Sequence, residues 1–423
     1  MAQPRLVALI AGTSGAKLYS MGLNILALAL TARWLGPDGR GILATLTTWV
    51  NTAAMLASLS LGSVAMQRLA GCRDSARFGD VFHALLRFAW ILAICAWGVM
   101  ALLWLARGSA LFGNAPAWAL ALACLMLPCL VWEGYANALL TTIERLRVFN
   151  LSLVTGRSLM LLGLLCLAVL DGVTLAGVLA VSVLAQCWIV GYSFPTLRAW
   201  ARQHQAVGAS TAEGRALLHG GMRLHLNTVG TLALNMAGTL LIANMLGARE
   251  AGFFQLAQQL MTVLLVIPQS ASLVIYGRQG ELGPDGVWPL QRKMLLGVVA
   301  LTAIAGLAMA MSAHIWLPWV AGPGYEPAIP LLLAMLPILV MLSFSSMMAS
   351  QWIGRGLFLT ASLLTVLVGL VNLLASSVWI PEFGMMGAVY AQLLALLVAV
   401  FTNSSMALWC ELKSRRLRAE SGK

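Results

Sequence analysis

Apolar segments long enough to cross a bilayer recur along the whole chain, and they restrict its possible folds more than any other feature. Crossing the hydrocarbon core takes about 20 helical residues. Because hydrocarbon offers no water to unpaired backbone groups, segments of this length must fold as helices. Twelve such segments lie near residues 8–32, 42–66, 84–106, 117–140, 149–170, 174–197, 222–245, 252–276, 294–313, 328–350, 357–379 and 385–409.

The composition supports the same class of protein. Hydrophobic residues make up 60% of the 423 positions and charged residues only 9%. A soluble chain of this length needs far more charge to cover its surface. The first apolar segment is too long for a signal-peptide core, so we interpret it as a retained first helix. The predicted fold is an all-α polytopic membrane protein with about twelve transmembrane helices.

Basic residues concentrate on alternate connecting segments. One set of segments holds 21 lysines and arginines, whereas the opposite set holds only Arg33, Arg40, Arg107 and Arg249, and Lys17 lies within a span. Basic residues accumulate on the cytoplasmic side of membrane proteins. The pattern therefore predicts that both termini are cytoplasmic, and it accounts for the net charge of +12 without nucleic acid.

The two halves of the chain share an internal repeat. The matching residues lie about 210 positions apart, and a Met-Leu-Pro sequence at 126–128 returns at 335–337. Three residues of the first repeat return 211 positions later: Asn24, Gly36 and Gly41 as Asn235, Gly247 and Gly252. Gly36 can end a helix with a positive φ, and Pro37 prevents the helix from continuing. The repeated prolines, Pro128 and Pro337, are each expected to bend a helix.

The repeat predicts the domain organisation. We expect an N-terminal six-helix half at 1–200, a cytoplasmic connector at 201–220, a C-terminal half at 221–410 and a basic cytoplasmic tail at 411–423. An even number of helices per half gives both halves the same orientation, which makes them a parallel repeat. In transporters of this kind the substrate path is a central cavity between the halves, and rocking alternates its access.

The segment Ala32–Gly41 and the Leu-Ser-Leu-Gly sequence at 59–62 resemble the opening of Wzx-type polysaccharide flippases. These flippases belong to the multidrug/oligosaccharidyl-lipid/polysaccharide exporter superfamily. The resemblance implies a V-shaped bundle in the bacterial inner membrane. It also implies transport of undecaprenyl-pyrophosphate-linked sugar units to the outer leaflet, with a polysaccharide polymerase and a chain-length regulator as possible partners.

Cationic residues within or at the start of spans are candidates for binding an anionic substrate. A charge inside a bilayer costs several kcal/mol, so each one calls for an explanation. Lys17 could meet a pyrophosphate, or it could reach back to the cytoplasmic headgroups. Arg223 and His225 enter the repeat partner of the first helix, and Arg157 lies just inside the start of the fifth span. These three could join Lys17 in the cavity or could form the inner rim.

Three further residues are candidates within the spans. Glu133 is the only acid well inside one, where it could carry a coupling proton, pair with Arg157 or be hydrated near the cytoplasmic end. Asn24 and Asn235 could contact sugar hydroxyls, or they could form interhelical hydrogen bonds.

Other functions are less compatible with the sequence. A multidrug or cation antiporter of the same superfamily needs acidic residues in its cavity, and the spans expected to line it contain none. A membrane-embedded polysaccharide polymerase or ligase needs larger outer loops with an acid–base cluster. The seven cysteines form no CxxC or Cys/His cluster, and no phosphate-binding loop is present. We therefore predict no catalytic residues, no metal and no cofactor.

Overall fold

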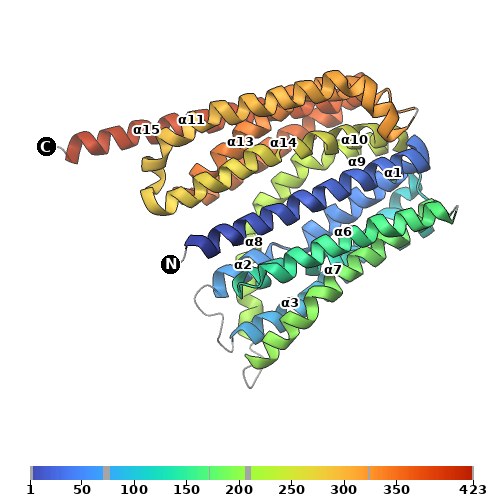
Figure 1. Ribbon diagram of the computed structural model, residues 1–423, viewed down its shortest axis with the longest axis horizontal. Coiled ribbons are helices and arrows are strands. Elements are labelled where there is room, and N and C mark those ends of the chain that lie inside the picture. The colour runs from blue at the N-terminus through green and yellow to red at the C-terminus, as the bar shows by residue number, and fades with distance from the viewer. Residues whose placement is uncertain (1–2, 70–76, 171, 205–210, 323, 422–423) are drawn as a thin grey trace. The chain divides into compact units, whose positions relative to one another are not determined.

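The computed structural model describes residues 3–69, 77–170, 172–204, 211–322 and 324–421, and within these ranges the chain is helical and contains no β-strand (Figure 1). The first part of the chain forms α1 (Gln3–Ala57), α2 (Leu61–Leu69), α3 (Arg77–Arg107), the short 3-10 helix η1 (Gly108–Phe112), α4 (Ala117–Cys124), α5 (Leu127–Thr142), α6 (Leu146–Val169) and α7 (Leu175–Gln203). The remainder forms α8 (Thr211–Asn235), α9 (Ala237–Met245), α10 (Ala248–Leu264), α11 (Val266–Ala321), α12 (Ala328–Ala334), α13 (Leu336–Gly354), α14 (Phe358–Phe383) and α15 (Met385–Ser421).

All twelve predicted spans fall on these helices. Among the described residues, nine helices are long and apolar enough to cross a membrane, and eleven spans result when α8–α9 and α12–α13 each count as one. These two pairs are bent by 47° and 45°. The first of the nine, Leu18–Ala57, contains a non-helical residue at Gly36, so it joins the spans predicted at 8–32 and 42–66. Dividing it there gives the predicted number.

The break at Gly36 confirms the predicted end of the first span and adds a detail. Gly36 has φ 66° and ψ 179°, a conformation with positive φ that is nearly confined to glycine because a Cβ would clash. The following Pro37 cannot donate a backbone hydrogen bond to the preceding turn. Its repeat mate Gly247 also has a positive φ, of 120°, at the start of α10. Both members of this repeated glycine pair therefore have a positive φ.

The two repeated prolines also interrupt helices, as predicted. Pro128 lies just inside the start of α5, after α4 has ended at Cys124. Pro337 lies in the same position of α13, after α12 has ended at Ala334. A break frees backbone carbonyls that hydrocarbon cannot satisfy. At the first break the indole N–H of Trp97 in α3 donates to the carbonyl of Cys124 at 2.7 Å, which satisfies that oxygen.

The break between α8 and α9 occurs without a proline. Side chains from other helices hold the carbonyls that it exposes: Asn372 of α14 donates to the carbonyls of Ala233 and Leu234 at 2.9 and 3.1 Å. Gln258 of α10 donates to the carbonyl of Asn235 at 3.0 Å. These bonds replace the helical pairing that ends at the bend.

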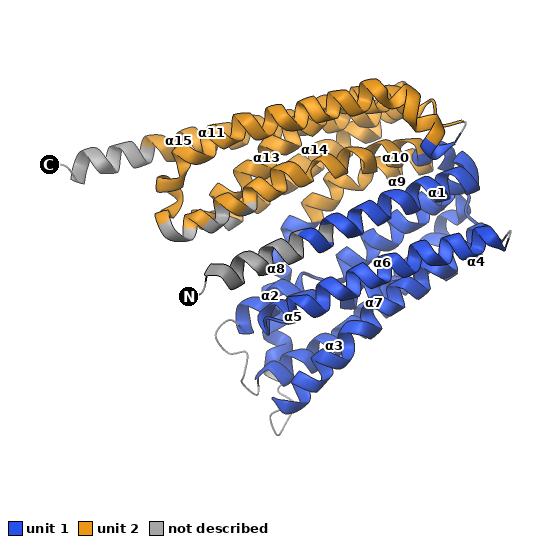
Figure 2. Cartoon of the chain, in the orientation of Figure 1, with its two compact units in different colours: residues 1–228, 247–252, 320–322 blue, residues 229–246, 253–319, 323–423 orange. Residues whose placement is uncertain are grey.

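The chain forms two compact units (Figure 2). Unit 1 comprises residues 1–228 with the short segments 247–252 and 320–322, and unit 2 comprises residues 229–246, 253–319 and 323–423. Helix α8 therefore begins in unit 1 and ends in unit 2. The division into halves near residues 200 and 221 remains a prediction from the repeat.

Each unit has its own apolar core. In unit 1 the core includes Leu46, Leu61, Phe82 and Trp132, which α1, α2, α3 and α5 contribute. Phe82 meets Trp132 edge to face with ring centroids 5.6 Å apart. Around α13 in unit 2, Met347 packs with residues of α11 and Trp352 packs with α15. Packing in these cores sets the positions of the helices within each unit, and those helices carry the polar candidate residues.

Candidate functional site

The predicted cationic residues of the first and fifth spans lie on neighbouring helices of unit 1. Helix α1 packs against α6 (Figure 1), and the hydroxyls of Tyr19 and Ser158 are hydrogen-bonded at 3.3 Å. Tyr19 follows Lys17 by two residues, and Ser158 follows Arg157 directly. The contact therefore places Lys17 and Arg157 at a similar level of the two helices, and the side chain of Arg157 is partly buried. The side chain of Lys17 lies outside the described residues.

Asn24 is exposed on a face of α1 that is otherwise packed. Residues seven apart share a helix face, as do residues three or four apart. Ser20, Ala27 and Thr31 surround Asn24 on that face and are buried, at 8%, 4% and 3% exposure. Asn24 itself is exposed. Its amide is therefore available to a hydroxyl-bearing ligand at a level where the neighbouring turns of the helix are covered.

His225 is held by the turn between α1 and α2. Its Nδ1 lies 3.3 Å from the Ser60 hydroxyl, which also lies 3.1 Å from the hydroxyl of Thr228. Ser60 has a positive φ of 54°, and the phenol of Tyr135 in α5 donates to the carbonyl of Ser58 at 2.8 Å. The turn thus presents the serine to α8. The side chain of Arg223, the other cation predicted here, lies outside the described residues.

Asn235 has a different environment from its repeat mate Asn24. It is the last residue of α8, and its amide nitrogen donates to the carbonyl of Thr231 at 3.0 Å. Its own carbonyl accepts the bond from Gln258 described above. The side-chain bond lies within α8, and only the backbone carbonyl accepts a bond from another helix. An interhelical hydrogen bond made by the Asn235 side chain therefore remains a prediction. Binding of sugar by Asn235 remains a prediction.

Glu133 faces α7 from α5. Its carboxylate accepts a short hydrogen bond from the side-chain amide of Gln186, which is buried at 4% exposure. Cys129 lies one helical turn before Glu133, and Cys187 directly follows Gln186. Their sulfurs are 3.8 Å apart. The partner of Glu133 is therefore Gln186 rather than Arg157. Sequence reasoning missed Gln186, although a glutamine inside an apolar span was a usable signal.

A second acid, Glu213, was missed altogether because it falls in the predicted connector. In the structure it lies near the start of α8, where its carboxylate accepts from Arg77 Nε at 2.7 Å and from Arg68 Nε at 2.9 Å. Its side chain is 12% exposed. Burial opposes ionisation, but the hydrogen bonds and positive charges of Arg77 and Arg68 outweigh it and lower the pKa of Glu213. The carboxylate is therefore charged at neutral pH.

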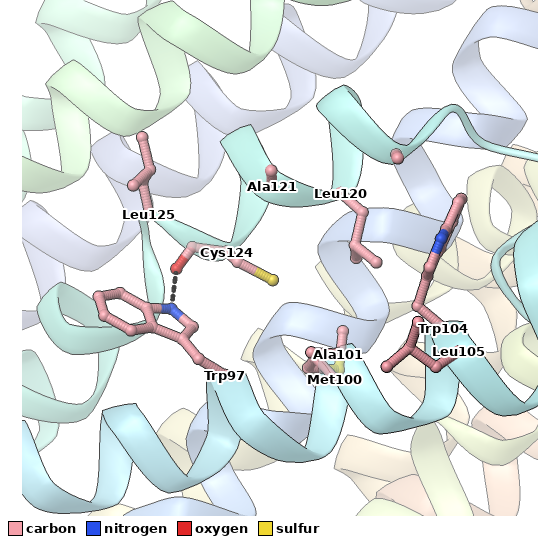
Figure 3. A pocket seen from close by; sticks show the side chains of 10 residues that line it. Trp97, Met100, Ala101, Trp104, Leu105, Leu120, Ala121, Cys124 and Leu125 are labelled. Atoms are coloured by element: carbon pink, nitrogen blue, oxygen red, sulfur yellow. Dashed lines mark hydrogen bonds between the residues drawn. The ribbon is translucent and has the colours of Figure 1, made fainter.

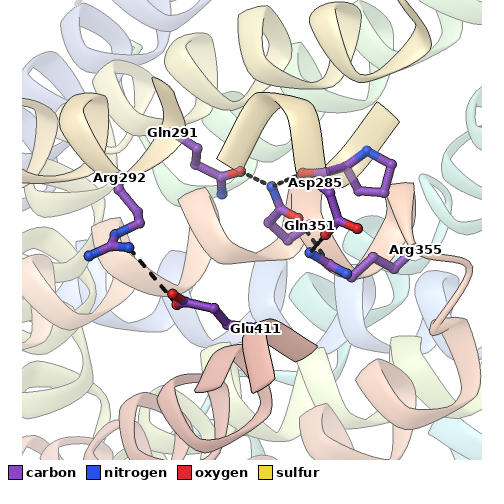
Figure 4. Close-up of polar contacts among 7 residues, drawn as sticks. Asp285, Gln291, Arg292, Gln351, Arg355 and Glu411 are labelled. Atoms are coloured by element: carbon purple, nitrogen blue, oxygen red, sulfur yellow. Dashed lines mark hydrogen bonds and ion pairs between the residues drawn. The ribbon is translucent and has the colours of Figure 1, made fainter. Parts of the chain in front are cut away.

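Unit 2 contains a polar cluster that the sequence did not predict (Figure 4). The buried amide of Gln291 in α11 donates to the carbonyl of Met347 at 2.7 Å. Gln351 of α13 donates to the side-chain oxygen of Gln291. Arg355 then pairs with Asp285 at 2.6 Å, two residues past the non-helical Gly283. The cluster holds the interrupted helix α11 against the end of α13.

A hollow of about 460 Å³ lies between α3 and α4 (Figure 3). Its walls include Trp97, Met100, Trp104, Leu120 and Leu125. None of its lining residues carries a charge. Such a surface can accommodate a hydrocarbon chain, but it lacks the cations that a diphosphate requires.

The described part of the chain contains no group of three or more His, Cys, Asp or Glu side chains arranged to hold a metal ion. The candidate residues of unit 1 supply a cationic group at Arg157, an amide at Asn24 and hydroxyls at Tyr19, Ser60 and Ser158. These groups can bind phosphate and sugar oxygens by charge and hydrogen bonding.

Comparison with known proteins identifies one family. A family model described as polysaccharide biosynthesis protein matches residues 7–276, which is more than half of the chain. No curated protein matches the chain by sequence.

Several solved structures share the fold. A multidrug resistance MATE family transporter of the MOP superfamily in an inward-facing conformation has a TM-score of 0.70 and 17% identity, covering 96% of each chain. The lipid II flippase MurJ in an inward closed conformation has a TM-score of 0.72 and 13% identity, covering 93% of this chain and 87% of its own. An outward-facing MATE transporter has a TM-score of 0.62 and 16% identity, covering 97% of this chain and 96% of its own. These likenesses establish the fold.

Proposed function

We propose that this chain, which belongs to the polysaccharide biosynthesis protein family and has the fold of MOP-superfamily transporters, is a flippase for an undecaprenyl-pyrophosphate-linked oligosaccharide. It moves this lipid from the inner to the outer leaflet of the bacterial inner membrane, where the sugar enters O-antigen, capsule or exopolysaccharide. The family match over residues 7–276 is the observation that carries the proposal. A polymerase and a chain-length regulator act with it on the exported unit.

The cations of unit 1 bind the diphosphate. Arg157 and Lys17 lie on the adjoining helices α6 and α1, and the contact between Tyr19 and Ser158 keeps the two helices together at that level. Arg223 adds positive charge from α8, and the imidazole of His225 adds a hydrogen-bonding group on the same helix. A guanidinium binds phosphate oxygens in pairs, and a lysine supplies a compact point charge. Asn24, exposed on α1, and Asn235 of α8 contact sugar hydroxyls.

Transport proceeds by alternating access, with Glu133 as the carboxyl group that couples it to protons. The side-chain amide of Gln186 donates to the carboxyl group of Glu133. Protonation removes the negative charge and weakens this charge-assisted bond between α5 and α7. Glu133→Gln should therefore leave export insensitive to dissipation of the proton gradient. Unaltered sensitivity in that variant would remove Glu133 from the coupling step.

The basic residues orient the protein with both termini in the cytoplasm. The inner set of 21 basic residues against four supports this topology. In that orientation Glu213, Arg68 and Arg77 lie on the cytoplasmic side, where the substrate is made.

Deletion of the chain tests the function in cells. The lipid-linked oligosaccharide should accumulate on the inner leaflet, and surface polysaccharide should be lost. The wild-type chain should restore export, whereas Lys17→Ala should restore it poorly at normal membrane abundance, because the diphosphate loses a counter-charge. Lys293→Ala, an exposed residue of α11, is the matched control. Normal surface polysaccharide in the deletion strain would refute the proposed cargo.

The multidrug MATE transporters among the similar structures favour one alternative, export of an organic cation. That alternative predicts a deletion strain with normal surface polysaccharide and increased sensitivity to cationic dyes. The same strain therefore separates the two functions.

A further inference from the structure

Two glycines that the sequence repeat pairs with each other are in contact in the structure. Gly41 of α1 and Gly252 of α10 are repeat mates, 211 positions apart, and both are buried. A Cβ built on Gly252 would lie 2.9 Å from the Cα of Gly41 and 3.2 Å from the carbonyl oxygen of Pro37. A Cβ built on Gly41 would overlap the carbonyl of Ala248 and lie 3.0 Å from the backbone nitrogen of Arg249. Any side chain at either position would push the two backbones apart.

The contact belongs wholly to unit 1, although α10 continues into unit 2. Residues 247–252 are part of unit 1, whereas the chain on both sides of them, 229–246 and 253–319, is part of unit 2 (Figure 2). The start of α10 is thus a short segment of the second repeat that is held by the first. The side of α1 that receives it is tightly packed: Thr45 is fully buried and donates to the carbonyl of Gly41 at 2.9 Å.

A third element closes over the same point. Gly113, the left-handed residue that ends η1, has its ideal Cβ position 3.0 Å from the Cβ of Ala248 and 3.2 Å from the hydroxyl of Thr45. Three connections of the chain therefore meet there: the segment after Gly36, the end of η1 and the start of α10. Arg33, Arg40, Arg107 and Arg249, the four basic residues of the sparsely charged and hence outer side, lie on or next to these connections.

We propose that the contact between Gly41 and Gly252 is the outer gate of the transporter. The start of α10 rests on α1 while the outer side is closed, and it leaves α1 when the substrate path opens outward. This inference rests on the proposed function, because a gate requires alternating access. It also gives a physical reason for the repeated glycines. Two backbones that meet without side chains can pack closely, and they can separate without any side chain having to change its rotamer.

A reversible crosslink tests the gate, in a background whose seven native cysteines are replaced. The pair Gly113→Cys and Ala248→Cys places two Cβ atoms close enough for a disulfide after a small shift. Oxidation should reduce export at least about tenfold, because the start of α10 is then tied to the end of η1 and cannot move away from the point where α1, η1 and α10 meet. Reductant should restore export. The Gly113→Cys single variant controls for strain at Gly113, and the Ala248→Cys single variant controls for the substitution in α10. Full export by the crosslinked protein would show that transport does not require this contact to open and would overturn the proposal.

A second measurement needs neither substrate nor export, so it can fail separately from the proposed cargo. Thr45→Cys should react slowly with a membrane-impermeant maleimide added outside, because Thr45 is fully buried. Adding Gly252→Ala should raise that rate several-fold by wedging the contact apart. Gly22→Ala is the control, since a Cβ at this position of α1 meets no neighbouring atom within 4 Å. An unchanged rate in the Gly252→Ala protein would contradict the gate.

Discussion

At the scale of single residues, the charge on Glu213 links stability to pH. Its pKa is lowered below the ordinary value of 4.5, so the ion pairs with Arg68 and Arg77 stabilise the folded chain above that pH and are lost as the pH falls through the lowered pKa. Glu213→Gln should reduce the melting temperature in detergent at pH 7. The difference from wild type should shrink only below pH 4.5. Glu382→Gln, at an exposed position, should behave like wild type. A difference that stays constant as the pH falls below 4.5 would assign the effect to something other than charge.

Some features of the candidate site can be predicted from a residue and its immediate sequence, whereas others depend on the fold. Charges inside apolar spans identified Glu133 and Arg157 as candidates because a charge in a bilayer is costly wherever it lies. Their partners could not be predicted in the same way. Gln186 lies 53 residues after Glu133, and His225 meets Ser60 across 165 residues. Such pairs depend on which helices are neighbours, which a single sequence does not specify.

At the scale of helices, the bend between α8 and α9 depends on one side chain from α14. Asn372 is 2% exposed and holds two carbonyls that the bend releases. Asn372→Leu keeps the volume but leaves both carbonyls without that donor, and should cost about 1 kcal/mol of stability. Thermal unfolding of the purified protein would measure the loss. Ser377→Ala, which removes only a bond to Leu374 of the same helix, should have little effect, and equal stability of the two variants would contradict this role.

The sequence predicted some of the helix breaks but not others, among them the bend between α8 and α9 and the interruption of α11 at Gly283. Proline and glycine act within their own turn of helix, so the interruptions at Gly36, Pro128 and Pro337 were predicted from local residues alone. The bend after Asn235 has no such residue. It is stabilised by donors from α10 and α14, 23 and more than 130 residues away. Likewise, the connector was read as a loop because its residues are polar, whereas α8 begins there at Thr211.

At the scale of the whole molecule, hydropathy and charge were sufficient for the fold class. The twelve spans correspond to helices because each must satisfy its backbone within the bilayer, whatever its neighbours are. The repeat also anticipated matching features in the two parts of the chain: positive φ at Gly36 and Gly247, and helix interruptions before Pro128 and Pro337. The close approach of Gly41 and Gly252 was not predicted, because a repeat identifies equivalent residues without saying that they touch.

The central claim is that the chain carries a lipid-linked oligosaccharide across a bilayer. The most direct measurement uses the purified chain in liposomes that contain undecaprenyl-pyrophosphate-linked oligosaccharide in both leaflets. A glycosidase added outside first digests the outer pool, and the sugar that becomes accessible afterwards is followed over time. The account predicts that the protected pool is consumed quickly with the wild-type chain and slowly with Lys17→Ala. A protected pool that declines no faster than in protein-free liposomes would contradict it.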